Sequence, residues 1–129
     1  MNGRYLLDTN IVVPFLNGET GLKDKLGQYE DIYLPVFVLG ELYYGAFNSS
    51  KKTYNLEKIE EFKEEIFILD CDEHTTKIYG EVKKGLKNKG TPIPENDIWI
   101  SAIAIQYNLT LVTRDSHFYN VDGLSIERW

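Results

Sequence analysis

Residues 4–10 read Arg-Tyr-Leu-Leu-Asp-Thr-Asn, and this stretch decides the fold. Its short apolar run ends abruptly at Asp8, a pattern that predicts a buried first strand followed by a turn and a helix. Apolar residues then recur at helical spacing as far as Leu16, and Asn17 with Gly18 ends that helix. A buried strand that leads directly into a helix is the first unit of an alternating α/β fold.

The rest of the chain alternates in the same way between short apolar runs and longer helical patterns. Strands are predicted at residues 32–35, 66–69, 109–112 and 124–126, helices at 36–47, 53–65, 72–88 and 95–107, and a short turn or helix at 116–120. Short strands that alternate with helices indicate parallel pairing with helices on both faces of the sheet. We therefore predict an α/β fold, a three-layer α/β/α sandwich with a central, mainly parallel five-stranded sheet, in one domain over residues 1–129.

The composition narrows the class of protein. The 129 residues are 43% hydrophobic and 26% charged, and no segment approaches the run of about 18 apolar residues that spans a bilayer. No export signal is recognised at the N-terminus, so a cytoplasmic protein is expected. Cys71 is the only cysteine, which excludes an intrachain disulfide and a cysteine-based zinc site.

The net charge of −6 argues against a typical nucleic-acid-binding protein, because phosphate contacts depend on lysine and arginine. That objection weakens if part of the negative charge is gathered in one cluster, since bound divalent cations would neutralise it. An acidic surface also suits a basic protein partner.

Four carboxylates follow or interrupt strongly hydrophobic runs: Asp8, Glu41, Asp97 and Asp115. Each would be costly to bury alone, so several of them fixed to apolar elements indicate one shared cation. Asp8 and Asp115 also follow predicted strands, where the crevice of a parallel sheet lies. Oxygen ligands without histidine or cysteine are those that Mg²⁺ and Mn²⁺ prefer. The sequence thus predicts a site for one or two such ions, suited to phosphodiester hydrolysis.

Each of these residues also has a simpler interpretation. Asp8 would cap the helix that follows it, Asp97 would favour the start of a helix, and Asp115 would be a turn residue. Glu41, which lies among apolar residues, would form a structural salt bridge. Taken together, the four favour a common site.

Four short segments carry a resemblance to a known family. They are residues 6–10 (Leu-Leu-Asp-Thr-Asn), 40–42 (Gly-Glu-Leu), 94–102 (Pro-Glu-Asn-Asp-Ile-Trp-Ile-Ser-Ala) and 113–118 (Thr-Arg-Asp-Ser-His-Phe). With these segments the chain resembles the PIN domains of VapC-type toxin ribonucleases from residue 4 to its C-terminus. The resemblance implies that the four acids hold Mg²⁺ or Mn²⁺, and that a metal-bound water cleaves RNA to leave a 5′-phosphate and a 3′-hydroxyl.

The resemblance also implies protein partners. A homodimer and a cognate antitoxin of the VapB type are expected, with RNA as the substrate. Tyr43, Tyr44 and Phe47, on the predicted helix of Glu41, suit a surface for either protein partner.

Further polar residues are expected near the acids. Thr9, Asn10 and Thr113 are predicted to orient the carboxylates or to bind metal-coordinated waters, although Thr113 would otherwise be an ordinary strand residue.

Basic residues supply candidate RNA contacts. Arg114, Lys83 and Lys87 are predicted to contact phosphates, with ordinary surface positions as the alternative. His74 and His117 belong to no metal-ligand spacing, and we interpret both as structural or surface residues.

Other functions are compatible with part of this pattern. A housekeeping nuclease that processes RNA would carry the same acids, whereas a catalytically silent PIN scaffold would not need them. A phosphotransfer enzyme of the haloacid dehalogenase or receiver type would share only Asp8, because the second aspartate expected two residues later is Asn10.

Overall fold

The computed structural model describes residues 3–29 and 31–129. Within them the chain forms one parallel sheet in the order β3-β2-β1-β4-β5. The strands are β1 (Tyr5–Leu7), β2 (Ile32–Pro35), β3 (Phe67–Leu69), β4 (Thr110–Val112) and β5 (Ile126–Glu127). The predicted five-stranded parallel sheet is therefore confirmed.

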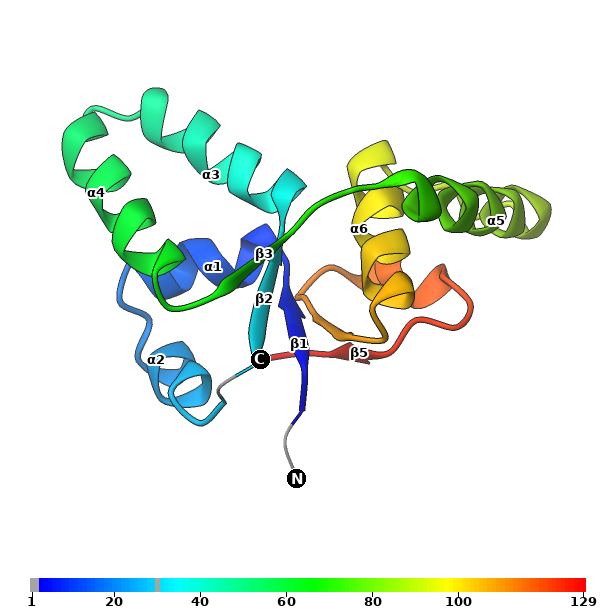
Figure 1. Ribbon diagram of the computed structural model, residues 1–129, viewed down its shortest axis with the longest axis horizontal. Coiled ribbons are helices and arrows are strands. Elements are labelled where there is room, and N and C mark those ends of the chain that lie inside the picture. Colours follow the sequence, from blue (N-terminus) through cyan, green and yellow to red (C-terminus); the bar gives the residue numbers. More distant parts are fainter. Residues whose placement is uncertain (1–2, 30) are drawn as a thin grey trace.

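Helices cover both faces of this sheet. They are α1 (Thr9–Leu16), α2 (Thr20–Leu26), α3 (Val36–Phe47), α4 (Lys52–Lys63), α5 (Glu73–Lys89), α6 (Glu95–Gln106) and the short 3₁₀ helix η1 (Ser116–Asn120). Parallel strands are joined by right-handed crossovers. When the chain stops adding strands on one side of β1 and begins to add them on the other, the connecting helices therefore move to the opposite face of the sheet. Accordingly α1 to α4 lie on one side of the sheet and α5 and α6 on the other (Figure 1), as the three-layer prediction requires.

The central strands are almost wholly apolar because they are covered on both faces. Leu6, Leu7, Leu111 and Val112 are fully buried, and Ile103 of α6 packs into the same core. No helix in the described part of the chain has the length and apolar character needed to cross a membrane.

Two local predictions differ from the structure. Helix α2 was not predicted, because only Leu22 and Leu26 in it are buried and Gly21 weakens its helical pattern. The last strand begins at Ile126 instead of residue 124, because it pairs only with Leu111 and Val112 of β4.

The sheet order places a crevice beside β1. The chain adds β2 on one side of β1 and, after crossing over the sheet, β4 on the other, so the carboxyl ends of β1 and β4 form a topological switch point. Leu7 lies opposite Val112, and the backbone N–H of Asp8 donates to the carbonyl of Val112 at 3.0 Å. The residues that follow these two strands, Asp8 and Thr113, are therefore neighbours.

Candidate active site

Asp8 is held in place by two hydrogen bonds at the end of β1. Only 6% of its surface is exposed. Its Oδ1 accepts from the backbone N–H of Thr9 at 2.8 Å, and its Oδ2 accepts from the hydroxyl of Thr113 at 2.8 Å. The first bond caps helix α1, so Asp8 does have the capping role that was its simpler interpretation. Asp8 also has unused lone pairs, because each carboxylate oxygen has two.

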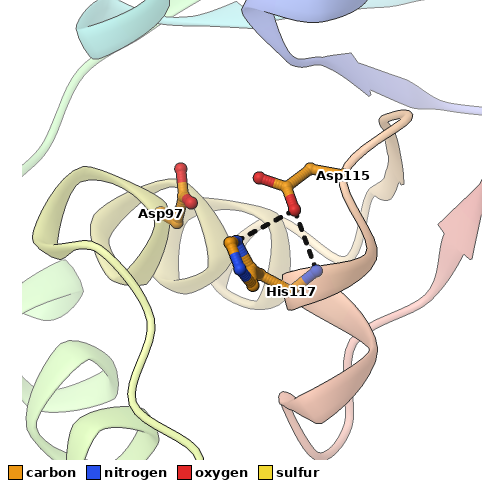
Figure 2. Close-up of side chains that lie close together, drawn as sticks. All are labelled: Asp97, Asp115 and His117. Atoms are coloured by element: carbon orange, nitrogen blue, oxygen red, sulfur yellow. Dashed lines mark hydrogen bonds and ion pairs between the residues drawn. The ribbon is translucent and has the colours of Figure 1, made fainter.

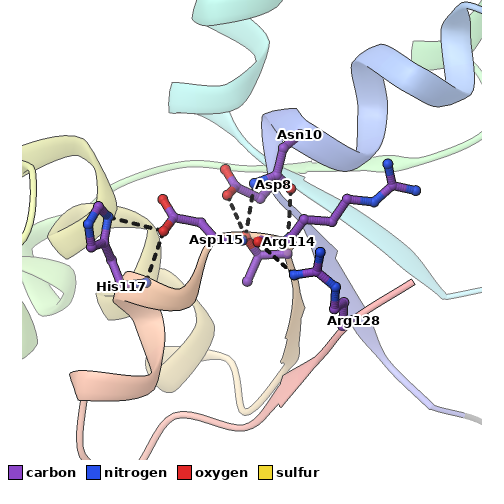
Figure 3. Close-up of polar contacts among 7 residues, drawn as sticks. Asp8, Asn10, Arg114, Asp115, His117 and Arg128 are labelled. Carbon is purple, nitrogen blue, oxygen red and sulfur yellow. Dashed lines mark hydrogen bonds and ion pairs between the residues drawn. The ribbon is translucent and has the colours of Figure 1, made fainter.

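The hydroxyl of Thr113 is the centre of a network that joins β1 to β4 (Figure 3). Besides donating to Asp8, it accepts from the Asn10 side-chain amide at 3.2 Å and from the backbone N–H of Asp115 at 3.0 Å. The Asn10 carbonyl in turn accepts from the backbone N–H of Arg114 at 3.0 Å. One buried hydroxyl therefore fixes the position of two of the four acids.

Glu41 reaches the same region from α3 through Thr9. The hydroxyl of Thr9 donates to Glu41 Oε1 at 3.1 Å. Glu41 lies among apolar residues in the sequence, but in the structure its side chain is exposed. Its neighbours Val38 and Leu42 are buried on the core face of α3, whereas Glu41 lies on another face of the helix.

Asp97, in the first turn of α6, and Asp115, directly before η1, bring two further acids to this region. One ligand atom from each, together with a ring nitrogen of His117, lies within 4.8 Å of the others. Asp115 Oδ1 accepts from the backbone N–H of His117 at 2.9 Å and lies 3.0 Å from His117 Nδ1. Figure 2 shows the His117 ring beside both carboxylates. The sequence interpretation did not include His117 in the site. It could have been included because it follows Asp115 by only two residues, so that a tight turn brings its ring back to the Asp115 carboxylate.

The electrostatics of the cluster are unfavourable without a cation. Burial, followed by the charges of Asp8, Asp115 and Glu41, raises the pKa of Asp97 to about 6, while His117 opposes this shift. Burial also raises the pKa of Asp8, and loss of water raises that of Glu41. Among the described residues none donates a hydrogen bond to the Asp97 carboxylate. The site therefore gathers several negatively charged carboxylates, and the Asp97 carboxylate has no hydrogen-bond donor in the described part of the chain. Such a set of oxygen ligands suits a hard divalent cation.

Arg114 is engaged elsewhere. Its guanidinium pairs with Glu19, with Nη1 at 3.2 Å from Oε1, and its Nε donates to the backbone carbonyl of Trp129 at 2.9 Å. Figure 3 shows its side chain running away from Asp115 and His117. This geometry does not support the predicted RNA contact of Arg114 and assigns it to tying the C-terminus to α2.

Lys83 and Lys87 lie on α5, beside the first turn of α6. Lys83 forms an ion pair with Glu95, two residues before Asp97, and its ammonium donates to the Tyr79 hydroxyl at 3.2 Å. Lys87 is exposed. An RNA contact by either lysine stays a prediction, and for Lys83 it requires exchanging the Glu95 carboxylate for a phosphate.

Replacing Thr113 with valine should loosen the site. The change leaves Asp8 Oδ2 and the backbone N–H of Asp115 without their partner, which costs about 1–3 kcal/mol of stability. Loss of a residue that orients ligands also lowers metal affinity by about 10–100-fold. Thermal melts and manganese titrations would measure both, with Thr113→Ser, which keeps the hydroxyl, as the matched control. Equal manganese affinity in the two variants would contradict this role.

The chain matches the PIN domain family over residues 5–124. That span contains all four acids and the strands β1 to β4, and it ends two residues before β5. The protein therefore belongs to the PIN domain family.

Its relatives within that family are toxins and ribonucleases. The chain is 35% identical to Ribonuclease VapC2 of Rickettsia felis, over 97% of each protein, and 32% identical to Toxin FitB of Neisseria gonorrhoeae, over 96% of this chain and 97% of FitB. Among solved structures, it is similar to VapBC2 of R. felis bound to a promoter DNA fragment (TM-score 0.91, 35% identity, 97% and 98% covered). DNA-bound VapBC of Salmonella typhimurium is also similar (TM-score 0.93, 27% identity, 98% of each chain).

Proposed function

We propose that this protein is a metal-dependent endoribonuclease and the toxin of a type II toxin–antitoxin pair, acting in the cytoplasm. The observation that carries the proposal is the proximity of the four acids at the switch point of a PIN fold, where the charges of Asp8, Asp115 and Glu41 all raise the pKa of Asp97. The similarity to Ribonuclease VapC2 supports the RNA substrate, and the similarity to the VapBC complexes supports the antitoxin.

The four acids would hold one or two Mg²⁺ or Mn²⁺ ions. All four offer oxygen, the ligand atom that these cations prefer, and the raised pKa of Asp97 supports a site that favours a positive charge. When bound, the metal activates water and stabilises the charge that develops on the phosphate, so that cleavage leaves a 5′-phosphate and a 3′-hydroxyl.

The protein's own contribution is to fix these oxygens before the metal arrives. Thr113 and the backbone of Thr9 restrain Asp8, and the Thr9 hydroxyl restrains Glu41. Each bond occupies one lone pair and leaves the others directed toward the crevice. Such preorganisation lets the site bind a cation without first having to order its ligands.

RNA would approach past the start of α6. The four acids lose their repulsion for phosphate once a cation is bound, which answers the objection raised by the net charge of −6. Lys83 and Lys87, beside that entrance, would then contact the RNA backbone as point charges.

Cleavage of a structured RNA pool tests the proposal directly. Purified protein is incubated with the pool in Mn²⁺, in EDTA and as the Asp97→Asn variant, and the cut ends are mapped by a method that requires a 5′-phosphate. Cleavage by the wild type with metal alone is the expected result. Absence of both cleavage and manganese binding would contradict the proposal and favour a silent scaffold.

The antitoxin would bind in a groove between α1, α3 and α4. Val13, Leu16, Gly45 and Ile59 are among the residues that line it, and Glu41 lies at its edge. Val13 is apolar and 42% exposed, so it adds to the apolar surface that the groove offers to a partner. An apolar segment of a VapB-type protein bound there would end beside an acid of the site, and this position would inhibit cleavage.

Filling the groove should release the antitoxin. A Cβ added at Gly45 meets no atom within 4 Å, so Gly45→Leu can begin its side chain without disturbing α3 and places an apolar group in the groove. We expect a loss of about 100-fold in affinity for the antitoxin encoded beside this gene, measured by calorimetry.

The matched control is Gly80→Leu on α5, where an added Cβ also meets no atom within 4 Å but the position does not line the groove. Both variants should melt at or above the wild-type temperature, because leucine favours a helix more than glycine does. Unchanged antitoxin affinity in Gly45→Leu would move the antitoxin to another surface.

For the homodimer, the exposed Tyr44 (73%) and Phe47 (62%) at the C-terminal end of α3 supply an apolar surface. Tyr43 is less available, because its ring is half-buried and its hydroxyl is bonded to Glu60 and Lys63. We therefore place Tyr44 and Phe47, but not Tyr43, at a protein contact.

A further inference from the structure

His117 lies within reach of the proposed metal, although the four acids alone would satisfy a magnesium site. Its ring nitrogen and one oxygen each from Asp97 and Asp115 lie within 4.8 Å of one another. Two ligands on opposite sides of a metal ion are about 4.2 Å apart. The three atoms therefore need only a shift of a few tenths of an ångström to share one ion.

Nδ1 of His117 is the ring nitrogen placed for a metal. It lies 3.0 Å from Asp115 Oδ1, and two adjacent ligands of one ion with bonds of about 2.1 Å are also about 3.0 Å apart. A cation bound to both atoms would take the place of the hydrogen that they otherwise share, because an imidazole nitrogen without hydrogen has a free lone pair.

Asp115 is fixed in the position that this arrangement requires. Its Oδ1 accepts from the backbone N–H of His117, which holds the carboxylate beside the ring, and within the described residues no group donates to Oδ2. Both oxygens of Asp115 therefore keep lone pairs for a cation.

We propose that His117 is a nitrogen ligand of the metal beside Asp97 and Asp115, and that it makes the site prefer Mn²⁺ and related transition ions over Mg²⁺. The inference rests on the proposed function, since it assumes that the four acids bind a divalent cation. Its chemical basis is that imidazole suits first-row transition ions, whereas Mg²⁺ is bound by carboxylates, carbonyls and water.

Electron spin-echo spectroscopy of the manganese-loaded protein tests the ligand itself. Protein labelled with ¹⁵N at histidine is compared with unlabelled protein, and the readout is the nuclear modulation that a directly bound nitrogen imposes on Mn²⁺. His117→Gln removes the ring but keeps the backbone N–H that Asp115 accepts. His74→Gln, at the other histidine, is the matched control, because His74 is exposed on the first turn of α5.

Competition calorimetry then measures selectivity. In His117→Gln the affinity for Mn²⁺ should fall about tenfold while that for Mg²⁺ changes less than about twofold, and His74→Gln should match the wild type. Manganese bound without nitrogen modulation would overturn the role of His117 and leave the acid site intact. Absence of any manganese binding by the wild type would overturn the proposed function as well.

Discussion

Asp97→Asn should lower metal-dependent RNA cleavage by about 1000-fold. A cation at such a site stabilises the transition state by several kcal/mol, and each 1.4 kcal/mol is tenfold in rate. Among the described residues no group donates a hydrogen bond to the Asp97 carboxylate. Its lone pairs therefore remain available to a metal ion. Asparagine has nearly the same shape but brings no charge and only one oxygen.

The measurement is the single-turnover cleavage rate of a mapped RNA site at saturating Mn²⁺. Asp24→Asn, at an exposed position on α2, is the control for loss of one negative charge, and it should cleave as the wild type does. If Asp97→Asn retained more than about a tenth of the wild-type rate, Asp97 would not be a ligand of the catalytic ion.

Removing metal should make the stability of the protein fall as pH rises from about 4 to about 6. The folded-state pKa of Asp97 is about 6, above its ordinary value of 3.8. Below pH 3.8 the group is protonated in both states and costs nothing. Between pH 3.8 and about 6 the folded state keeps the Asp97 proton more tightly than the unfolded state does. The free energy of unfolding therefore falls as pH rises through this range, and it stays lower above about pH 6.

Asp8 and Glu41 act in the same direction, because their pKa values are also raised. For Asp97 alone the loss is on the order of 1 kcal/mol after allowance for solvent screening. Without metal at pH 7, Asp97→Asn should therefore melt higher than the wild type.

Metal should reverse this loss. Mn²⁺ at 100 times its dissociation constant adds about 2.7 kcal/mol, which is roughly 10 °C in melting temperature for a domain of this size. The gain should shrink below pH 5, where protons compete for the carboxylates. Melts in EDTA and in Mn²⁺ from pH 4 to 8 measure it, and the same gain in Asp97→Asn would show that the ion binds elsewhere.

Much of the fold was predictable because burial leaves a local pattern. The strands around Leu6 and Leu111 are short apolar runs, since a parallel strand covered on both faces has no polar side to display. Asp8 and Asp115 were predicted at one crevice because the carboxyl ends of parallel strands meet at one edge. Helix α2, with few buried residues, left too weak a pattern.

Side-chain partners were predictable only where they are close in sequence. Arg114 pairs with Glu19 across 95 positions, and no local pattern encodes that choice. Thr113 was expected near the acids, but its place at the centre of the network depends on the register of β1 against β4. That the four acids and His117 bind metal stays a prediction.

The network at Thr113 also determines when in the life of the chain the site can exist. Thr113 is joined to Asp8 across 105 residues, and Asp97 and Asp115 follow Glu41 by 56 and 74 residues. A chain still being synthesised holds Asp8 and Glu41 long before the other two acids have been made. An unfinished or truncated chain therefore cannot assemble the proposed metal site, which forms only when β4 pairs with β1.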